Sequence, residues 1–468
     1  MKPRLVTVML LVLALAVPAS MLAQGSKVGD LSAEQKLFHD IYKELVEINT
    51  THSVGDNTQA ARAMQKRFME AGFTAEEIQI FEPFPRKGNL VLRLKGTGEK
   101  KPILLLAHLD VVEAKREDWK TDPFKLQESD GYFTARGSID CKALAASIVS
   151  VVSQLKREGY KPDRDIIVAL TADEERVDVP ENGAAWLLHN KRELIEAAYG
   201  LNEGGEGELR DGKPLILRVQ VSEKQFMTVE LETTNPGGHA ARPSQQNAIY
   251  ELMDALNHIA QYAFPVHLTE AVRVYFERQA TLTTGQVAED MRTLTQDEHN
   301  QAAIERISAR PDLVGMIRTT CVATMLQAGH AENALPQHAK ATLNCRILPG
   351  ESADAVEQQL KQLAGPKVTL RVTNKSVPAP ASPTSHEMMS AIEKVSAQMW
   401  PGVPVVAYMA PSTTDSRWMR NVGIPMYGIS GVFTVPSNGV HGLNERVGQK
   451  ELYDSREFLY RLVKMLTS

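Results

Sequence analysis

The chain of 468 residues has few cysteines, few aromatic residues and no excess of basic charge. Its 3 cysteines allow at most one disulfide, so the fold depends on apolar cores rather than on a disulfide framework. The 52 basic and 57 acidic residues give a formal net charge of -5, which argues against nucleic acid or an anionic membrane as the main partner. With 43% hydrophobic and 23% charged residues, the composition is typical of a globular chain with two or more domains.

One long apolar run stands at the N-terminus. Lys2 and Arg4 precede the run at 5–17, and small residues including Ala19 and Ala23 follow it. Because the run is shorter than the roughly 20 residues of a membrane-spanning helix, we expect residues 1–23 to be a cleaved signal peptide. An uncleaved anchor is the alternative. Cleavage would give a secreted or periplasmic protein that is not attached to a membrane and works in an oxidising compartment.

Helices and strands alternate from residue 32 onward. The expected strands are 89–94, 102–106 and 165–170, and the expected helices are 32–48, 58–71 and 142–155. Continuous apolar strands separated by helices indicate an α/β fold in which helices cover both faces of the sheet.

The order of elements changes near residue 215. The expected strands there are 226–231, 319–325, 339–347 and 368–372, with helices at 247–262 and 353–363. This βαββαβ order is typical of a complete small domain. After a linker at 377–385 the first pattern resumes. We therefore expect a domain over 27–215 and 377–468 that is interrupted by a second domain over 216–376. The polar stretch 277–311 is expected to form a helical insertion or a surface excursion.

Acidic residues and a histidine gather at the ends of the expected strands. They are His108, Asp110, Glu174, Glu175 and Glu203, and Asp140 lies just before the helix at 142–155. Open α/β sheets bind ligands at the carboxyl ends of their strands. Buried carboxylates are rare without a partner, and a divalent cation would supply the compensating charge.

Five segments carry these residues in order: Ala-His-Leu-Asp, Ala-Arg-Gly-Ser-Ile-Asp-Cys-Lys, Asp-Glu-Glu, Asn-Glu-Gly-Gly and His-Gly-Leu-Asn-Glu, which contains His441. In these segments the sequence resembles the co-catalytic zinc peptidases that include aminoacylase, glutamate carboxypeptidase, carboxypeptidase S and succinyl-diaminopimelate desuccinylase. The resemblance spans nearly the whole mature chain. It implies a zinc-peptidase catalytic domain with a mixed sheet, interrupted by a ferredoxin-like βαββαβ domain that acts as a lid and dimerisation domain.

The resemblance also implies two zinc ions, with Co²⁺ or Mn²⁺ as alternatives. The implied ligands are His108, Asp140 and Glu203 for one metal, and Asp140, Glu175 and His441 for the other, so that Asp140 bridges. Glu174 would be the general base. Asp110 would hold His108 from behind and fix its tautomer.

Further residues are implied in the second domain. His239, in Asn-Pro-Gly-Gly-His, resembles a lid histidine that stabilises the oxyanion and can reach the site of a partner subunit, so a homodimer through the lid is expected. Asn333 and Arg346 match lid positions that contact substrate, although a structural salt bridge is the alternative for Arg346. Arg417 resembles a position near the substrate in carboxypeptidase S-like members.

The cysteines depart from the family pattern or stay ambiguous. Cys141 follows the bridging aspartate, where the family often has Asp, and is expected to be a small filler or a soft extra ligand. The peptide bond between Asp140 and Cys141 is commonly cis in relatives. Cys321 and Cys345 lie on strands that could form a hairpin, and they either pair or stay as two buried thiols.

The expected function is that of an exported dinuclear zinc metallopeptidase. It would hydrolyse the amide bond of small peptides or N-acyl amino acids that bear a free carboxylate, in the manner of a carboxypeptidase or dipeptidase. An aminoacylase-like N-acyl amino acid amidohydrolase is the alternative. A metal-retaining binding protein is the non-enzyme reading, which the presence of Glu174 disfavours. The second domain disfavours a single-domain zinc aminopeptidase.

Overall fold

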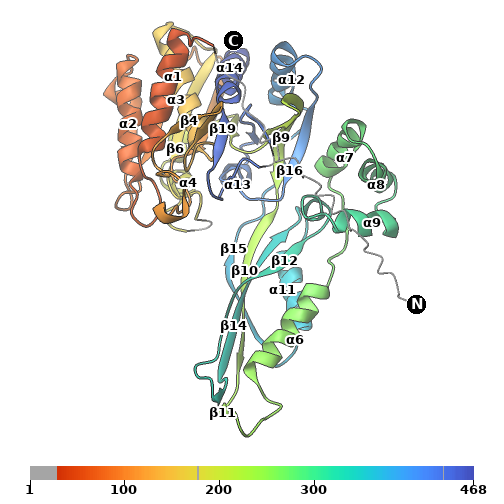
Figure 1. The fold of residues 1–468 in the computed structure, drawn as a ribbon. Coiled ribbons are helices and arrows are strands. Elements are labelled where there is room, and N and C mark those ends of the chain that lie inside the picture. Colours follow the sequence, from red (N-terminus) through yellow and green to blue (C-terminus); the bar gives the residue numbers. More distant parts are fainter. Residues whose placement is uncertain (1–28, 177–178, 436) are drawn as a thin grey trace, which may run out of the picture.

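The structure is a computed structural model that describes residues 29–176, 179–435 and 437–468 (Figure 1). The expected signal peptide, residues 1–23, lies outside the described residues. Within the described ranges no helix is both long and apolar enough to cross a membrane.

A mixed sheet forms the centre of the larger domain. In the described part of the chain it has ten strands, ordered β1-β2-β6-β3-β7-β17-β9-β8-β18, with β16 paired to β9. The strands are β1 (Ile78–Phe81), β2 (Asn89–Leu94), β3 (Lys100–His108), β6 (Arg164–Thr171), β7 (Tyr199–Asn202), β8 (Gly207–Arg210), β9 (Lys213–Glu223), β16 (Val405–Ala410), β17 (Met426–Gly428) and β18 (Phe433–Thr434). Strands β6, β3 and β7 run parallel, so their carboxyl ends meet at one edge of the sheet.

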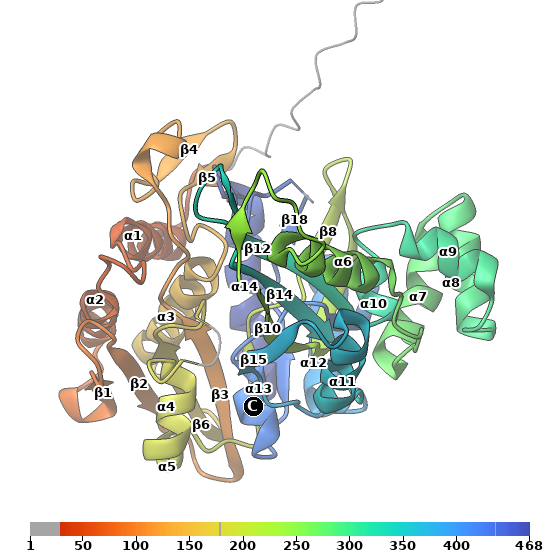
Figure 2. The ribbon, with the colours of Figure 1, turned by 90° about the horizontal axis from the view of Figure 1, so that it is seen from below.

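Helices cover both faces of this sheet, which confirms the expected fold class (Figure 2). One face carries α1 (Ala33–Glu47), α2 (Asn57–Glu70), α3 (Lys142–Arg157), α12 (Glu387–Met399) and α14 (Gln449–Leu466); the other carries α4 (Gly183–Asn190), α5 (Arg192–Ile195) and α13 (Ser416–Asn421). In β3, Ile103 and Leu105 pack into the first apolar core and Leu104 and Leu106 into the second. This alternation explains why the central part of the strand, residues 103–107, is continuously apolar.

Short elements complete the larger domain. They are the 3-10 turns η1 (Ala75–Glu77) and η2 (Arg116–Asp118), and a three-stranded sheet of β4 (Gln127–Ser129), β5 (Tyr132–Thr134) and β19 (Arg446–Gly448).

The inserted domain is a separate antiparallel sheet with two helices. Its strands are β10 (Gln225–Thr234), β12 (Thr320–Ala328), β14 (His338–Ile347) and β15 (Thr369–Lys375), ordered β12-β14-β10-β15, and its helices are α6 (Ala248–Gln261) and α11 (Ala353–Ala364). This is the βαββαβ order that the sequence predicts. Cys321 and Cys345 stand opposite each other on β12 and β14 and form a disulfide. At the far tip, β11 (Gly238–His239) pairs with β13 (Ala334–Leu335) (Figure 1).

Two expectations about the inserted domain need correction. The boundary at 215 falls inside β9, because this strand belongs to the larger sheet, and the chain enters the inserted sheet with β10. The helical excursion comprises α7 (Glu270–Leu282), α8 (Gln286–Gln296), α9 (Gln301–Ser308) and α10 (Val314–Ile317). It was expected within 216–376, but it packs on the larger domain beside β16 (Figures 1 and 2). Its apolar side chains, such as Val272 and Phe276, extend the core of that domain.

Candidate metal centre and active site

The expected metal ligands converge at the carboxyl edge of the larger sheet. His108 is the last residue of β3, Glu175 follows β6, and Glu203 follows β7. Asp140 lies two residues before α3, and His441 comes from the loop that precedes β19. Segments far apart in the sequence therefore supply one cluster, as ligand sites at the ends of parallel strands do.

Asp140 lies between the two histidines. Its Oδ1 is 3.1 Å from Nε2 of His108, and its Oδ2 is 3.0 Å from Nε2 of His441. Each histidine thus meets a different oxygen of the same carboxylate. This is the arrangement that a carboxylate bridging two metal ions requires.

The remaining two ligands complete one set on each side. Oε2 of Glu203 lies 3.5 Å from Nε2 of His108, and Oε2 of Glu175 lies 3.1 Å from Nε2 of His441. Metal–ligand distances of about 2.0–2.2 Å place the ligand atoms of a tetrahedral site roughly 3.3–3.6 Å apart. The spacing and the mixture of imidazole and carboxylate donors therefore fit divalent metal ions.

The electrostatics of the cluster also call for cations. Burial raises the pKa of Glu203 to about 7, and the neighbouring Asp140 and Glu175 add to this rise. Burial likewise raises the pKa of Glu175. Hydrogen bonds to Asp140 and Glu175 raise the pKa of His441 to about 10. Burial therefore disfavours the charged forms of Glu203 and Glu175, and divalent metal ions would supply the positive charge that stabilises both carboxylates.

Glu174 lies beside this cluster with a buried side chain. In an extended strand Glu174 and Glu175 would point to opposite faces. Asp173, just before them, has a left-handed φ of 57°, so the chain turns at the end of β6 and both glutamates can face the site. Burial raises the pKa of Glu174 well above its usual value, and Glu203 adds to the rise. A carboxylate of raised pKa beside a metal site is suited to taking and returning a proton.

Asp110 lies against His108 and against both glutamates. Its carboxylate accepts hydrogen bonds from the backbone N–H groups of Glu174 and Glu175, both at 3.1 Å. Nδ1 of His108 is 3.0 Å from the backbone oxygen of Asp110 and 3.5 Å from its carboxylate. The backbone carbonyl is the nearer acceptor for His108, and the carboxylate, which is also close to His108, binds the backbone of the two glutamates as well.

Glu445 is a positioning residue that our sequence analysis missed. Its carboxylate accepts hydrogen bonds from the N–H groups of Gly137, Ile139 and Asp140 and from the guanidinium of Arg136, over 2.7 to 3.1 Å. The residue is buried and ties the His441 loop to the Asp140 loop. It is the last residue of the motif His-Gly-Leu-Asn-Glu, which was the available signal.

Asp415 is a second buried carboxylate that the sequence did not single out. Its Oδ1 accepts a hydrogen bond of 2.7 Å from the side-chain amide of Asn182. Burial raises the pKa of Asp415 to about 6, and its charge in turn raises the pKa of Glu174. It therefore contributes to the environment of the expected general base.

Arg346 and Arg417 lie on the side of the site that faces the inserted domain. Nη1 of Arg346 donates to Oγ1 of Thr413 at 3.2 Å, and its guanidinium stacks over Phe226 at 5.0 Å. Burial lowers the pKa of Arg346, whereas the nearby charge of Glu174 raises it. Arg417 is buried close to Asp415. The two guanidinium groups therefore stand near each other, with Arg346 close to Glu174 and Arg417 close to Asp415.

His239 and Asn333 lie together, but away from these residues. His239 is exposed on β11, and the N–H of Ala240 donates to the backbone oxygen of Asn333 at 2.9 Å. Figure 1 places β11 at the end of the inserted domain remote from the metal ligands. The structure thus brings together Arg346, Arg417 and the metal ligands, and it leaves His239 and Asn333 outside the site of their own chain.

Cys141 is buried beside the cluster. Its peptide bond with Asp140 is cis, and its sulfur lies with ligand atoms of His108 and Glu203 within 4.8 Å of one another. Burial raises the pKa of its thiol well above the usual value. Metal ions bind the thiolate rather than the thiol.

Comparison with known proteins decides the family. Residues 104–465 match peptidase family M20/M25/M40. The chain belongs to this family. It is 28% identical over 400 residues to a probable carboxypeptidase S-like 2 of Dictyostelium discoideum, which covers 80% of this chain and 74% of that protein. It is 26% identical over 379 residues to the N-fatty-acyl-amino acid synthase/hydrolase PM20D1 of Homo sapiens (78% and 74%) and 27% identical over 414 residues to aminoacylase-1 of Mus musculus (87% and 90%).

Solved structures of the M20 family share the fold. An M20 family metallo-carboxypeptidase of Sulfolobus solfataricus superposes with a TM-score of 0.71 at 16% identity, over 93% of this chain and 99% of that one. Human carnosine dipeptidase 1 gives a TM-score of 0.64 at 16% identity, over 92% and 97%. The family match and these relatives indicate a hydrolytic enzyme of the metallopeptidase and amidohydrolase kind.

Proposed function

We propose that this M20 family member is an exported dinuclear zinc hydrolase. It cleaves the amide bond of small peptides or N-acyl amino acids next to a free carboxylate, with carboxypeptidase or dipeptidase action as the leading form. The observation that carries the proposal is the contact of His108 and His441 with different oxygens of Asp140, with Glu174 alongside.

In the proposed reaction the metal ions and the surrounding side chains have separate roles. Zinc ions held by the two ligand sets would polarise the scissile carbonyl and acidify the attacking water. Glu174 takes a proton from that water and passes it to the leaving amine, a task that its raised pKa suits. Arg346 and Arg417 are placed to bind the substrate carboxylate, for which guanidinium groups offer paired donors.

An N-acyl amino acid amidohydrolase is the second candidate. It is favoured by relatives whose names are aminoacylase-1 and N-fatty-acyl-amino acid synthase/hydrolase. Both candidates require a free carboxylate on the part of the substrate that is released as the amine. They differ in the acyl group on the other side of the amide bond.

The disulfide between Cys321 and Cys345 supports export. Disulfides persist in oxidising compartments and are rare in the cytosol. This agrees with the signal peptide that the sequence predicts over residues 1–23.

A homodimer through the inserted domain is supported by an exposed apolar edge. On β12, Val322, Met325 and Leu326 are 58%, 59% and 61% exposed, and on the adjacent α6 Tyr250 and Met253 are 62% and 56% exposed. Strand β12 is also an edge of its sheet, with backbone groups open to pairing. A partner bound there would bury these side chains and could bring the tip with His239 to the site of the other chain.

Metal analysis combined with a substrate panel tests the proposal. The mature protein, reconstituted separately with Zn²⁺, Co²⁺ and Mn²⁺, should bind two ions per chain and hydrolyse members of a panel of dipeptides, longer peptides and N-acyl amino acids. Cleavage of peptides over N-acyl amino acids would favour the carboxypeptidase reading. Tight binding of two metals without any hydrolysis would favour a binding protein, and capture of one metal or none would overturn the dinuclear site.

A further inference from the structure

The helical excursion encloses a cavity against the larger domain. The cavity has a volume of about 490 Å³, which lies within the range of pockets for small molecules. The excursion contributes Tyr275 and Gln279 from α7, Val287 and Met291 from α8, and Met316 from α10. Because the excursion packs on the sheet of the larger domain, this wall is fixed relative to the metal ligands.

The opposite wall continues directly from the metal ligands. Glu206 lies three residues after Glu203, and Asn438 lies three residues before His441. Oγ1 of Thr434 donates to Oε2 of Glu206 at 3.1 Å, so the two segments touch in this wall. The segments that carry Glu203 and His441 thus also form this wall, and the pKa of Glu206 is raised by burial and also by the charge of Asp140, as expected if Glu206 lies near the centre. Arg346, on β14 of the inserted domain, and Arg417, on α13, do not line the cavity.

The charged side chains that line the cavity balance in number, with Glu206, Glu208 and Asp312 against Arg210, Arg218 and Arg310. Three arginines are present, and each has an acceptor: Arg210 bonds Glu208 at 3.2 Å, Arg310 bonds Asp312 at 2.7 Å, and Arg218 donates to the backbone oxygen of Glu206 at 3.1 Å. Apolar side chains such as Val287, Met291 and Met316 supply other parts of the lining. A charged group would find no unbalanced opposite charge among these residues, whereas an uncharged group would fit.

Gln279 adds a specific polar feature. Its side chain is almost fully buried, with the residue 7% exposed, yet its Oε1 has no hydrogen-bond partner among the described residues. Its Nε2 is 3.5 Å from Oγ1 of Thr283. A buried amide oxygen without a partner is costly. A ligand that enters the cavity with an N–H or O–H group would satisfy it.

We propose that this cavity binds the acyl part of the substrate, and that it selects an uncharged acyl group which is longer than acetyl and carries an N–H or O–H donor for Gln279. This inference rests on the proposed function and refines its substrate class. The substrate would then lie across the metal centre, with its carboxylate at the two arginines and its acyl group under the helical excursion.

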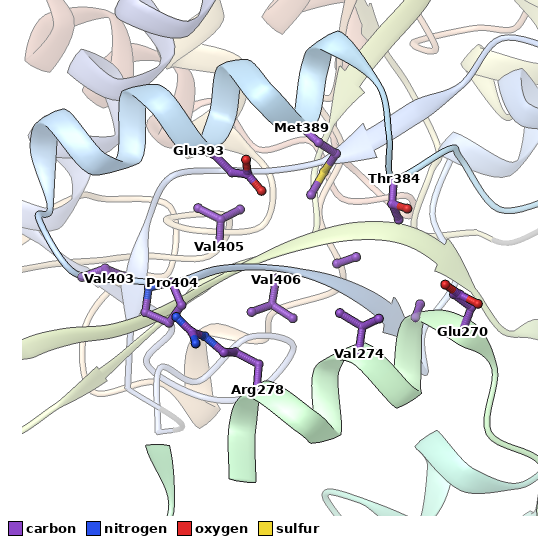
Figure 3. A pocket seen from close by; sticks show the side chains of 12 residues that line it. Glu270, Val274, Arg278, Thr384, Met389, Glu393, Val403, Pro404, Val405 and Val406 are labelled. Carbon is purple, nitrogen blue, oxygen red and sulfur yellow. The ribbon is translucent and has the colours of Figure 1, made fainter. Parts of the chain in front are cut away.

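A second hollow provides a matched control. It has a volume of about 510 Å³ and lies against α7, where Val274 and Arg278 face Met389 and Val405 (Figure 3). Its lining residues lie on α7, α12 and β16 and the segments that lead into the last two, and none of them adjoins a metal ligand in sequence. A tryptophan at Val274, on α7, adds the same bulk to the helical excursion as one at Val287, on α8, but Val274 does not line the first cavity.

Binding to an inactive protein tests the pocket independently of turnover. The probes are the N-acetyl, N-hexanoyl and N-(acetylglycyl) derivatives of the amino acid that the panel shows to be released fastest, or of leucine if none is released. Each is titrated calorimetrically into the mature zinc-loaded Glu174→Gln protein, alone and combined with Val287→Trp, Gln279→Met or Val274→Trp.

We expect Val287→Trp to weaken the two longer probes about tenfold or more and to spare the acetyl probe, since steric exclusion from an apolar pocket has this size. Gln279→Met should weaken the N-(acetylglycyl) probe about tenfold relative to the N-hexanoyl probe, because only the former carries an extra N–H. Val274→Trp should change none of them. Thermal unfolding of each variant shows whether it is folded, and Gln279→Met tests the pocket if Val287→Trp fails to fold.

Equal effects of Val287→Trp on all three probes, or no effect of either cavity variant, would overturn the pocket. That result is distinct from failure of the proposed function, in which the wild-type protein hydrolyses no member of the panel. If the wild-type protein hydrolyses substrates but the cavity variants bind the probes with unchanged selectivity, the pocket proposal is rejected and the proposed enzymatic function is retained.

Discussion

The metal centre and the tip of the inserted domain are built in different ways. At the centre, loops at the edge of the sheet supply ligands whose atoms approach within 3.0 to 3.5 Å, and the carboxylate of Glu445 holds the Asp140 loop. At the tip, His239 is exposed on a two-residue strand whose partner is β13. Under the proposed assignment one chain supplies all the metal ligands, whereas any catalytic role of the tip needs a second chain or a domain movement.

The largest loss of activity should come from a substitution at the metal centre. Glu174→Gln should lower kcat by about 10²–10⁴-fold, because it removes the group that transfers the proton. The variant should still bind two metal ions, since Glu174 is not among the proposed ligands. Activity assays with metal analysis on the same sample check this. Turnover near that of the wild type would remove the proposed mechanism.

The next largest loss of activity should come from a substitution at the tip of the inserted domain. His239→Ala should lower kcat by about 10²-fold, the usual cost of removing a donor to the oxyanion, without changing metal content or thermal unfolding. The exposed His330, in the segment between β12 and β13, gives a matched control in His330→Ala, which should behave like the wild type.

Mixing two inactive variants decides whether the tip serves a partner. In a shared-site dimer, a His239→Ala chain keeps an intact metal centre and would receive His239 from a Glu174→Gln partner. Co-refolded mixtures should therefore recover part of the lost activity. If mixtures stay as inactive as the separate variants, or if a monomeric protein with Met325→Lys remains fully active, the tip acts within its own chain or not at all.

The third largest effect should be a loss of metal affinity when Glu445 is replaced. Glu445→Gln removes the negative charge that faces Arg136 and weakens the support of Asp140, so zinc affinity should fall about 10–100-fold, as with other residues behind metal ligands. Competition with a chelator measures this. The exposed Glu457, paired with Arg461 on α14, supplies the control Glu457→Gln, which should leave affinity unchanged.

The centre was predictable from sequence to a greater extent than the residues around it. Several of the expected ligands stand in short motifs at the ends of apolar strands. Such a strand and its end can be recognised from a short stretch of sequence. Asp415 acts through a contact with a residue far away in the chain, so no local pattern marks it. Glu445 stands in the motif of His441, but its contacts with the distant Asp140 loop could not be predicted from that motif. The boundary at 215 was misplaced because β9, which belongs to the larger sheet, was not among the expected strands, whereas the expected strand 226–231 lies within β10.

The helical excursion shows the same limit. Its polar sequence at 277–311 indicated helices or a surface excursion, and helices are present. Which domain they cover depends on a narrow set of buried side chains, including Val272, Phe276 and Met291, that join the core of the larger domain. Position in the chain suggested the inserted domain instead.

The smallest effect on catalysis should come from the disulfide of the inserted domain. Replacing Cys321 and Cys345 with alanine should lower the free energy of unfolding by about 2–4 kcal/mol, because the bridge closes a loop of sequence separation 24. The paired strands β12 and β14 remain, and no metal ligand is touched, so metal content and kcat at low temperature should change less than about twofold. Denaturant unfolding and zinc analysis separate the two regions: loss of zinc in the folded double variant would show that the inserted domain supports the centre, and unchanged stability would show that the bridge does not constrain it.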